Sequence, residues 1–133
     1  MLLGKVFINI NQKLKSIKFN NIQFNSKDCK PNDIFFAIKG KNINGNNYIN
    51  NAILNGAKII VSNLKFEGFD KNKILFIYNK NPRKLLSEVA SLFFKLKPSN
   101  IIGVTGTNGK TSIANFYYQI LNLNKKRVAA IGT

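Results

Sequence analysis

The stretch from Asn100 to Ser112, NIIGVTGTNGKTS, constrains the fold more than any other part of the chain. Its apolar run at 101–104 predicts a buried strand, and apolar residues recur at helical spacing after Gly109. Glycines between them let the backbone curl, so that successive N–H groups face one concavity that suits a polyphosphate. The N-terminus of the following helix adds positive potential. The stretch therefore predicts a phosphate-binding loop between a strand and a helix.

The residues of this loop have separate predicted roles. Lys110 is the candidate catalytic residue, because its ammonium group can reach the β- and γ-phosphates, and Thr111 is the candidate ligand of Mg²⁺. The common spacing G-x-x-x-x-G-K-[ST] would place its first glycine at Val104, so a glycine-rich turn with a chance Lys-Thr pair is the alternative interpretation. The implied cofactors are ATP and Mg²⁺. The predicted ATP-binding residues are Gly106, Thr107, Asn108, Gly109, Lys110, Thr111 and Ser112.

Composition limits the remaining chemistry. The 133 residues, 44% of them hydrophobic, suit one ordinary core, and no apolar run approaches the ~20 residues of a membrane span. The first five residues are too short for the apolar part of a secretory signal, so we expect a cytoplasmic protein. A single cysteine, Cys29, and no histidine exclude an internal disulfide and Ser-His-Asp or His-metal chemistry in this chain. We interpret Cys29 as an ordinary small residue beside a turn.

The formal net charge of +16 raises the question of nucleic-acid binding. The lysines are scattered singly among asparagines, and Asn, Lys, Ile and Phe are overused together, as biased coding composition would produce. We therefore expect no nucleic-acid partner. A P-loop nucleic-acid-binding ATPase remains the alternative that the charge favours.

Apolar periodicity and turn residues predict an α/β fold in two parts. The Lys97–Asn100 segment breaks the pattern, so we expect domains at 1–98 and 99–133. The second part is a strand–helix–strand unit, too small to bury a parallel sheet on both faces, so we expect the chain to end inside that domain. Asn81 and Pro82 are the predicted N-cap and first residue of a long helix, and Gly56 follows the end of a shorter one. The predicted strands are 6–10, 22–24, 34–38, 57–62, 74–78, 101–104 and 127–131, and the predicted helices are 48–53, 83–96 and 110–123.

Two motifs resemble the Mur ligases, which add amino acids to UDP-linked muramic acid during peptidoglycan synthesis. Asn25–Lys27 followed by Pro31–Gly40 resembles their D-S-R … P-G-D-L-F-x-A-x-x-G block, and Gly103–Thr111 is similar to their nucleotide loop almost letter for letter. Asn25, Lys27 and Asn32 replace an aspartate, an arginine and a glycine of that pattern. Lys27 lacks the planar fork of arginine, whereas Asn32 can still adopt a left-handed turn conformation.

The resemblance implies a UDP-binding α/β domain followed by the first βαβ unit of a P-loop ATPase domain, truncated. It implies ATP-dependent amide formation through an acyl phosphate, with a UDP-N-acetylmuramoyl-dipeptide and a free amino acid as substrates. The T-N-G-K-T loop and Ile131–Thr133 look more like the branch that adds the third residue. The dipeptide-adding branch and a non-catalytic UDP-binding remnant are the alternatives. The implied UDP-substrate contacts are Phe24, Ser26, Lys41, Asn42 and Ile43.

Two further expectations concern the state of the protein. A full-length ligase of this kind is expected to be a monomer. The 133-residue chain alone is expected to be inactive, because residues 99–133 lack the rest of their sheet. Without it, the helix at 110–123 would leave its apolar face bare and this part of the chain would be poorly ordered.

Overall fold

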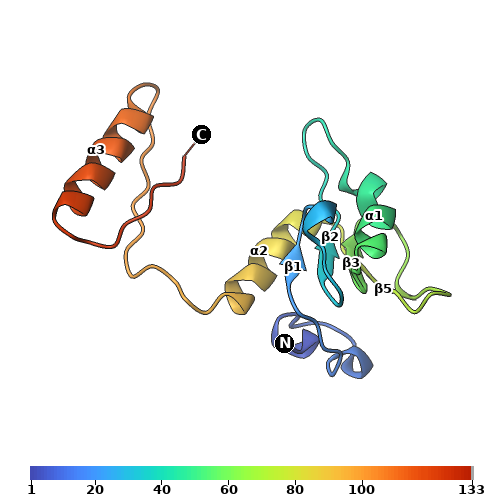
Figure 1. Cartoon of the computed structure of the whole chain (residues 1–133). Helices are drawn as coiled ribbons and strands as arrows, with labels where there is room; N and C mark the ends of the chain where they lie inside the picture. The colour runs from blue at the N-terminus through green and yellow to red at the C-terminus, as the bar shows by residue number, and fades with distance from the viewer. Residues whose placement is uncertain (133) are drawn as a thin grey trace. The chain divides into compact units, whose positions relative to one another are not determined.

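The computed structural model describes residues 1–132, which form two compact units, Met1–Leu96 and the part that begins at Lys97. The first unit holds all five strands and two of the α-helices; α3 belongs to the second (Figure 1). The strands are β1 (Ile22–Gln23), β2 (Ile34–Phe36), β3 (Ile59–Ser62), β4 (Gly68–Phe69) and β5 (Leu75–Tyr78). The helices are α1 (Ile49–Leu54), α2 (Pro82–Phe93) and α3 (Lys110–Leu123), with 3-10 helices η1 (Leu3–Lys5), η2 (Gln12–Leu14), η3 (Ser26–Asp28) and η4 (Gly45–Tyr48).

The sheet has the order β1-β2-β3-β5-β4. The first four of these strands are parallel, and β4 pairs antiparallel with β5 at the edge. Because the parallel strands run the same way, their carboxyl ends lie along one edge of the sheet. This mixed α/β sheet confirms the predicted fold class for the first unit.

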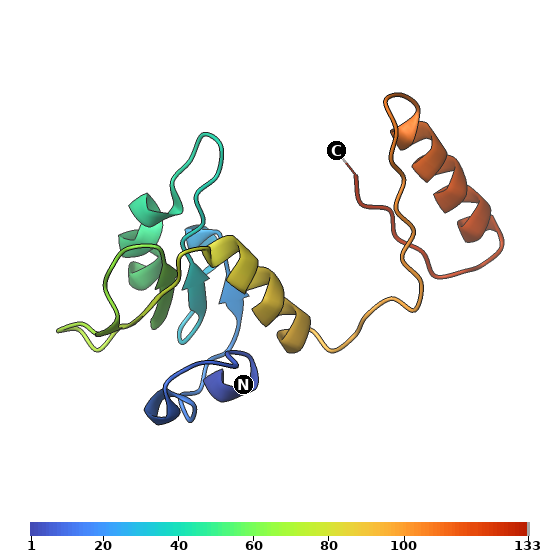
Figure 2. The same cartoon turned by 180° about the vertical axis from the view of Figure 1, so that it is seen from behind.

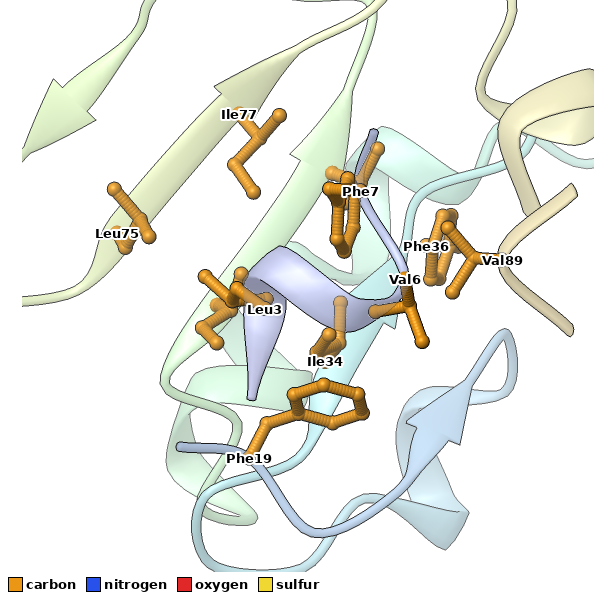
Figure 3. Packing of buried hydrophobic residues seen from close by; sticks show 11 residues of the cluster. Leu3, Val6, Phe7, Phe19, Ile34, Phe36, Leu75, Ile77 and Val89 are labelled. Carbon is orange, nitrogen blue, oxygen red and sulfur yellow. The ribbon is translucent and has the colours of Figure 1, made fainter. Parts of the chain in front are cut away.

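Alternating side chains give the sheet two buried faces. Ile34, Phe36 and Val61 belong to a core cluster with Val89 of α2 and the N-terminal segment. Phe35 and Ile60 belong to a second cluster, which α1 completes. The two helices therefore cover opposite faces, as Figures 1 and 2 show. Figure 3 shows the first cluster, with Val89 beside Phe36 and with Leu3 and Phe19 near Ile34. Burial on both faces explains why β2 and the first three residues of β3 are all apolar.

A hydrogen-bonded turn before β2 explains the Pro31–Asp33 motif. The fully buried Asp33 carboxylate accepts two backbone N–H bonds, from Asn21 and from Lys30, each at 3.0 Å. Asn32 has φ 65°, which confirms the predicted left-handed conformation, and its N–H donates to the Gly56 carbonyl at 3.0 Å. These residues tie β1, β2 and the end of α1 together, so this part of the motif serves the fold.

The helix ends follow the predicted capping residues. The Asn81 side chain accepts a hydrogen bond from the Lys84 N–H at 3.1 Å, and Pro82 is the first residue of α2. α2 ends at Phe93, three residues before the predicted end. Gly56, at φ 108°, follows α1 as predicted, and α3 has the predicted bounds.

Three predicted strands are wrong. Residues 6–10 form no strand, because the N–H groups of Val6 and Phe7 donate to the Leu3 carbonyl at 3.0 and 2.9 Å and continue a turn. Residues 101–104 and 127–131 also form no strand among residues 1–132, so the predicted βαβ unit is represented by its helix alone. A strand needs a hydrogen-bonding neighbour, and this segment has none.

The apolar face of α3 is exposed, as the sequence predicted. Ile113, Phe116, Tyr117 and Ile120 are 44% to 63% exposed. Within residues 1–132, no helix is long and apolar enough to cross a membrane.

Candidate substrate and nucleotide sites

Four of the five predicted UDP contacts lie in segments that follow the carboxyl ends of β1 and β2. Phe24 directly follows β1 and is 70% exposed. Lys41, Asn42 and Ile43 lie in the loop after β2, and all three are exposed. In open α/β sheets, ligands bind outside the carboxyl ends of the strands. The edge of β1 and β2 is therefore the candidate substrate site.

The loop over residues 38–45 is closed by two backbone hydrogen bonds. The Gly45 N–H donates to the Ile38 carbonyl at 3.0 Å, and the Gly40 N–H donates to the Ile43 carbonyl at 2.7 Å. A Cβ at Gly45 would lie 2.5 Å from the Ile38 nitrogen, so only glycine fits there. The bonds close the loop on itself and fix the backbone on both sides of its tip, residues 41–43.

Side chains from two neighbouring elements also hold this loop. The Arg83 guanidinium, in the first turn of α2, donates to the Lys39 carbonyl at 3.3 Å. The Asn46 amide, just after the loop, donates to the Asn63 side chain that follows β3, at 2.8 Å. Neither Arg83 nor Asn46 was among the residues predicted for the site. The sequence held one signal that could have pointed to Arg83: it is one of only two arginines among 21 cationic residues.

Ser26 has a different environment from the other predicted contacts. It is 5% exposed and lies in η3, and its carbonyl accepts a hydrogen bond from the Asn55 amide at 2.9 Å. Its backbone is thus fixed against the end of α1. The UDP contact of Ser26 stays a prediction.

Cys29 lies in the core beside the Asp33 turn. Its side chain is buried, and the thiol donates to the Asn25 carbonyl at 3.7 Å. Burial, with the nearby Asp33 and Asp28 carboxylates, raises the pKa of the Cys29 thiol from 9.0 to about 11. A buried thiol with a raised pKa is a poor nucleophile, which supports its interpretation as a structural residue.

We expect the folded chain to react slowly at Cys29 with a disulfide reagent at pH 8. A pKa higher by about 2 lowers the thiolate population roughly 100-fold at that pH, and burial slows access further. Because the folded thiol binds its proton more tightly, its contribution to stability is complete below pH 9 and is lost as the pH rises toward 11. Absorbance of the released thiol, in buffer and in denaturant, measures the reaction. Cys29→Ser is the control for the pH dependence, and rapid stoichiometric labelling of the folded chain would contradict the expectation.

The loop before α3 combines two glycines of positive φ with a lysine side chain that folds over it. Gly106 and Gly109 have φ of 152° and 74°, and Gly109 is the N-cap of the helix. The Lys110 ammonium folds back over the loop and donates to the carbonyls of Gly106 and Thr107 at 2.6 and 3.2 Å. Among the described residues, the N–H groups of residues 107–109 donate no hydrogen bond. The loop therefore combines an ammonium group with unused N–H donors at a helix N-terminus.

The residues present offer little to a metal ion on their own. Thr111, in the first turn of α3, is exposed and supplies a hydroxyl oxygen. Residues 1–132 contain no group of three or more His, Cys, Asp or Glu side chains that could hold a metal. Magnesium commonly binds through few protein oxygens together with substrate phosphates, and Thr111 fits that role.

Comparisons with known proteins identify the family of the chain. Residues 18–94 match the model of the Mur ligase family, catalytic domain. This match covers more than half of the chain, and the chain belongs to the Mur ligase family.

The curated relatives are more specific. The chain is 40% identical over 127 residues to UDP-N-acetylmuramoyl-L-alanyl-D-glutamate–2,6-diaminopimelate ligase of Rickettsia typhi, covering 94% of this chain and 25% of the relative. It is 42% identical over 137 residues to the ligase of the same name in Clostridium tetani, covering 98% of this chain and 28% of that protein. The chain thus spans about a quarter of the length of these relatives.

A solved structure also matches. The MurF ligase of Thermotoga maritima in complex with ADP aligns with a TM-score of 0.61 and 28% sequence identity. The alignment covers 78% of this chain and 23% of that protein. The Ile131–Thr133 segment, which resembles the third-residue branch, ends at Thr133, and Thr133 lies outside the described residues.

Proposed function

We propose that this chain supplies the UDP-substrate domain and the phosphate loop of an ATP-dependent ligase of peptidoglycan precursor synthesis. The ligase would add 2,6-diaminopimelate to UDP-N-acetylmuramoyl-L-alanyl-D-glutamate. The observation that carries the proposal is the 40% identity over 94% of the chain to a relative with that name. This identity exceeds the 28% found with the MurF ligase, which favours the third-residue branch over the dipeptide-adding one.

The proposed reaction forms an amide in two steps. A carboxylate of the dipeptide substrate attacks the γ-phosphate of ATP, giving an acyl phosphate and ADP. The amine of the incoming amino acid then attacks the acyl carbon and releases phosphate. The Lys110 ammonium and the free N–H groups of residues 107–109 would neutralise the charge that develops during phosphoryl transfer.

The binding of the uridine diphosphate moiety would fall to the carboxyl edge of the sheet. Phe24 offers an exposed aromatic face, and Lys41 brings a cation to the tip of the preformed 38–45 loop. A loop already held by hydrogen bonds loses little entropy when a ligand binds. The phosphate loop belongs to the other compact unit, so the proposal assigns each unit a different part of the reaction.

We expect UDP to shift the backbone amide signals of the 133-residue chain at Phe24, Ser26 and residues 41–43. Titration of the isotope-labelled chain, followed by NMR, is the measurement. CDP is the matched control, because it carries the same phosphates on a different base. A chain of net charge +16 attracts any polyphosphate, so only shifts that UDP causes and CDP does not count as specific.

The outcome separates the alternatives. Equal, scattered shifts with UDP and CDP would contradict the substrate site. Specific UDP binding without turnover, in a complete ligase that contains this segment, would instead favour a non-catalytic UDP-binding remnant. Binding to DNA with a steep salt dependence would favour the nucleic-acid-binding ATPase.

A further inference from the structure

The chain contains three Asn-Gly pairs, at Asn44–Gly45, Asn55–Gly56 and Asn108–Gly109. Asparagine is a thermolabile residue, and an Asn-Gly pair reacts most readily because glycine does not shield its own nitrogen. The glycine nitrogen attacks the side-chain amide carbon of asparagine. All three asparagines are exposed, so exposure does not distinguish them.

Two of the pairs are protected by hydrogen bonds. In the first pair, the Gly45 N–H donates to the Ile38 carbonyl at 3.0 Å, and the Asn44 side chain accepts from the Asn46 N–H at 3.1 Å. In each protected pair, both reacting groups are therefore engaged and must be released before they can meet.

The second pair is held in the same way. The Gly56 N–H donates to the Ile53 carbonyl at 2.9 Å. The Asn55 amide donates to the Ser26 carbonyl, also at 2.9 Å.

The third pair is unprotected. Among the described residues, neither the Gly109 N–H nor the Asn108 side chain makes a hydrogen bond. The pair also lies in the exposed loop at the start of α3, where Gly109 has φ 74°. Both reacting groups are thus available without any local opening.

We propose that Asn108 is a site of spontaneous deamidation in the phosphate loop. The Gly109 nitrogen forms a bond to the Asn108 side-chain carbon, the bond from that carbon to the amide nitrogen breaks, and ammonia leaves. Water then opens the resulting cyclic imide to aspartate or isoaspartate. Either product carries a carboxylate, and isoaspartate also lengthens the backbone by one carbon.

The consequence for nucleotide binding rests on the proposed function. A carboxylate at Asn108 opposes the positive potential that the helix N-terminus and Lys110 give the loop, so it weakens binding of a polyphosphate. Conversely, a phosphate that accepts the Gly109 N–H engages the attacking nitrogen. Bound ATP therefore slows the modification.

The test follows the three asparagines in one sample. The folded 133-residue chain is incubated at mildly alkaline pH, digested under acidic conditions, and each asparagine is scored by the mass gain of its fragment ions. Asn108 is expected to react at least about tenfold faster than Asn44 and Asn55, because each of those pairs needs two hydrogen bonds to open. In denaturant the three rates should converge, since the protecting bonds are gone.

Two controls make the result decisive. Asn108→Gln should remove the rapid component and leave the rates at Asn44 and Asn55 unchanged. Reaction of Asn44 or Asn55 as fast as Asn108 in the folded chain would overturn the proposal. The ATP arm is separate: selective reaction at Asn108 that ATP does not slow would sustain the modification site and count against nucleotide binding by this loop.

Discussion

Lys110→Ala is expected to abolish ligation in a complete ligase while leaving binding of the UDP-linked substrate nearly unchanged. Lys110 is the cation that lies over the predicted phosphate loop, 2.6 Å from the Gly106 carbonyl oxygen. Groups that stabilise a transferring phosphoryl are typically worth about 10³-fold or more in turnover. A complete enzyme for this test can be made by placing residues 1–133 in the matching segment of the Rickettsia typhi relative.

Phosphate release and calorimetric titration of the UDP substrate measure the two halves of this expectation. Lys126→Ala is the matched control, since it removes another exposed cation of the same unit from the turn after α3. An undiminished rate in Lys110→Ala would refute the assignment of the catalytic residue. A loss of UDP-substrate affinity would show that the two sites are not independent.

Gly56→Ala should destabilise the first unit more than any other glycine-to-alanine change at a positive φ. Gly56 has φ 108°, and a Cβ there would lie 2.7 Å from the Pro31 nitrogen and 2.8 Å from its Cα. Both atoms belong to the backbone of the turn that Asp33 fixes, so they cannot move aside cheaply. We expect a loss of about 3 kcal/mol or more in the free energy of unfolding, measured by urea denaturation and circular dichroism.

Gly68→Ala provides an unusually close control. Gly68 has φ 112°, almost the same as Gly56, but a Cβ there would meet nothing within 4 Å. It should cost only the backbone strain, about 1–2 kcal/mol, so the difference between the variants measures the steric clash. Equal losses in the free energy of unfolding would show that the backbone at Pro31 moves to accommodate the added Cβ. The close approach of Pro31 to Gly56 would then not be a constraint.

Elements with a strong local signal were predicted from the sequence. α2 has a capping asparagine and an N-terminal proline, and α3 follows a glycine-rich loop, so their starts were found correctly. β4 was missed because Gly68 and Phe69 carry no strand-like apolar pattern, and their pairing with β5 is not encoded locally. The predicted strand at 6–10 failed for a related reason. An apolar run shows that Val6 and Phe7 are buried, but not that a 3-10 turn buries them.

The sequence proposed residues for the candidate sites, and these assignments stay predictions; it did not give their arrangement. The glycine-rich loop chemistry pointed to residues 106–112, whereas residues 41–43 followed only from the resemblance to the Mur ligases. That Phe24 and Lys41 share one edge follows from the parallel pairing of β1 and β2, which spacing along the chain does not reveal. The contact from Arg83 to the Lys39 carbonyl spans 44 positions, so it required the structure.

The bare face of α3 has a practical consequence when it is set against the charge of the chain. The part beginning at Lys97 contains no acidic residue, so every charged side chain in the unit that carries this exposed apolar face is a cation. At low ionic strength, mutual repulsion keeps such rows apart. The Debye length falls from about 10 Å at 0.1 M salt to about 3 Å at 1 M. At the higher salt concentration, the cations of two neighbouring molecules are screened from each other at distances longer than a side chain. Self-association of the chain through α3 is therefore expected to increase with ionic strength. The salt concentration should be held constant whenever samples of this chain are compared.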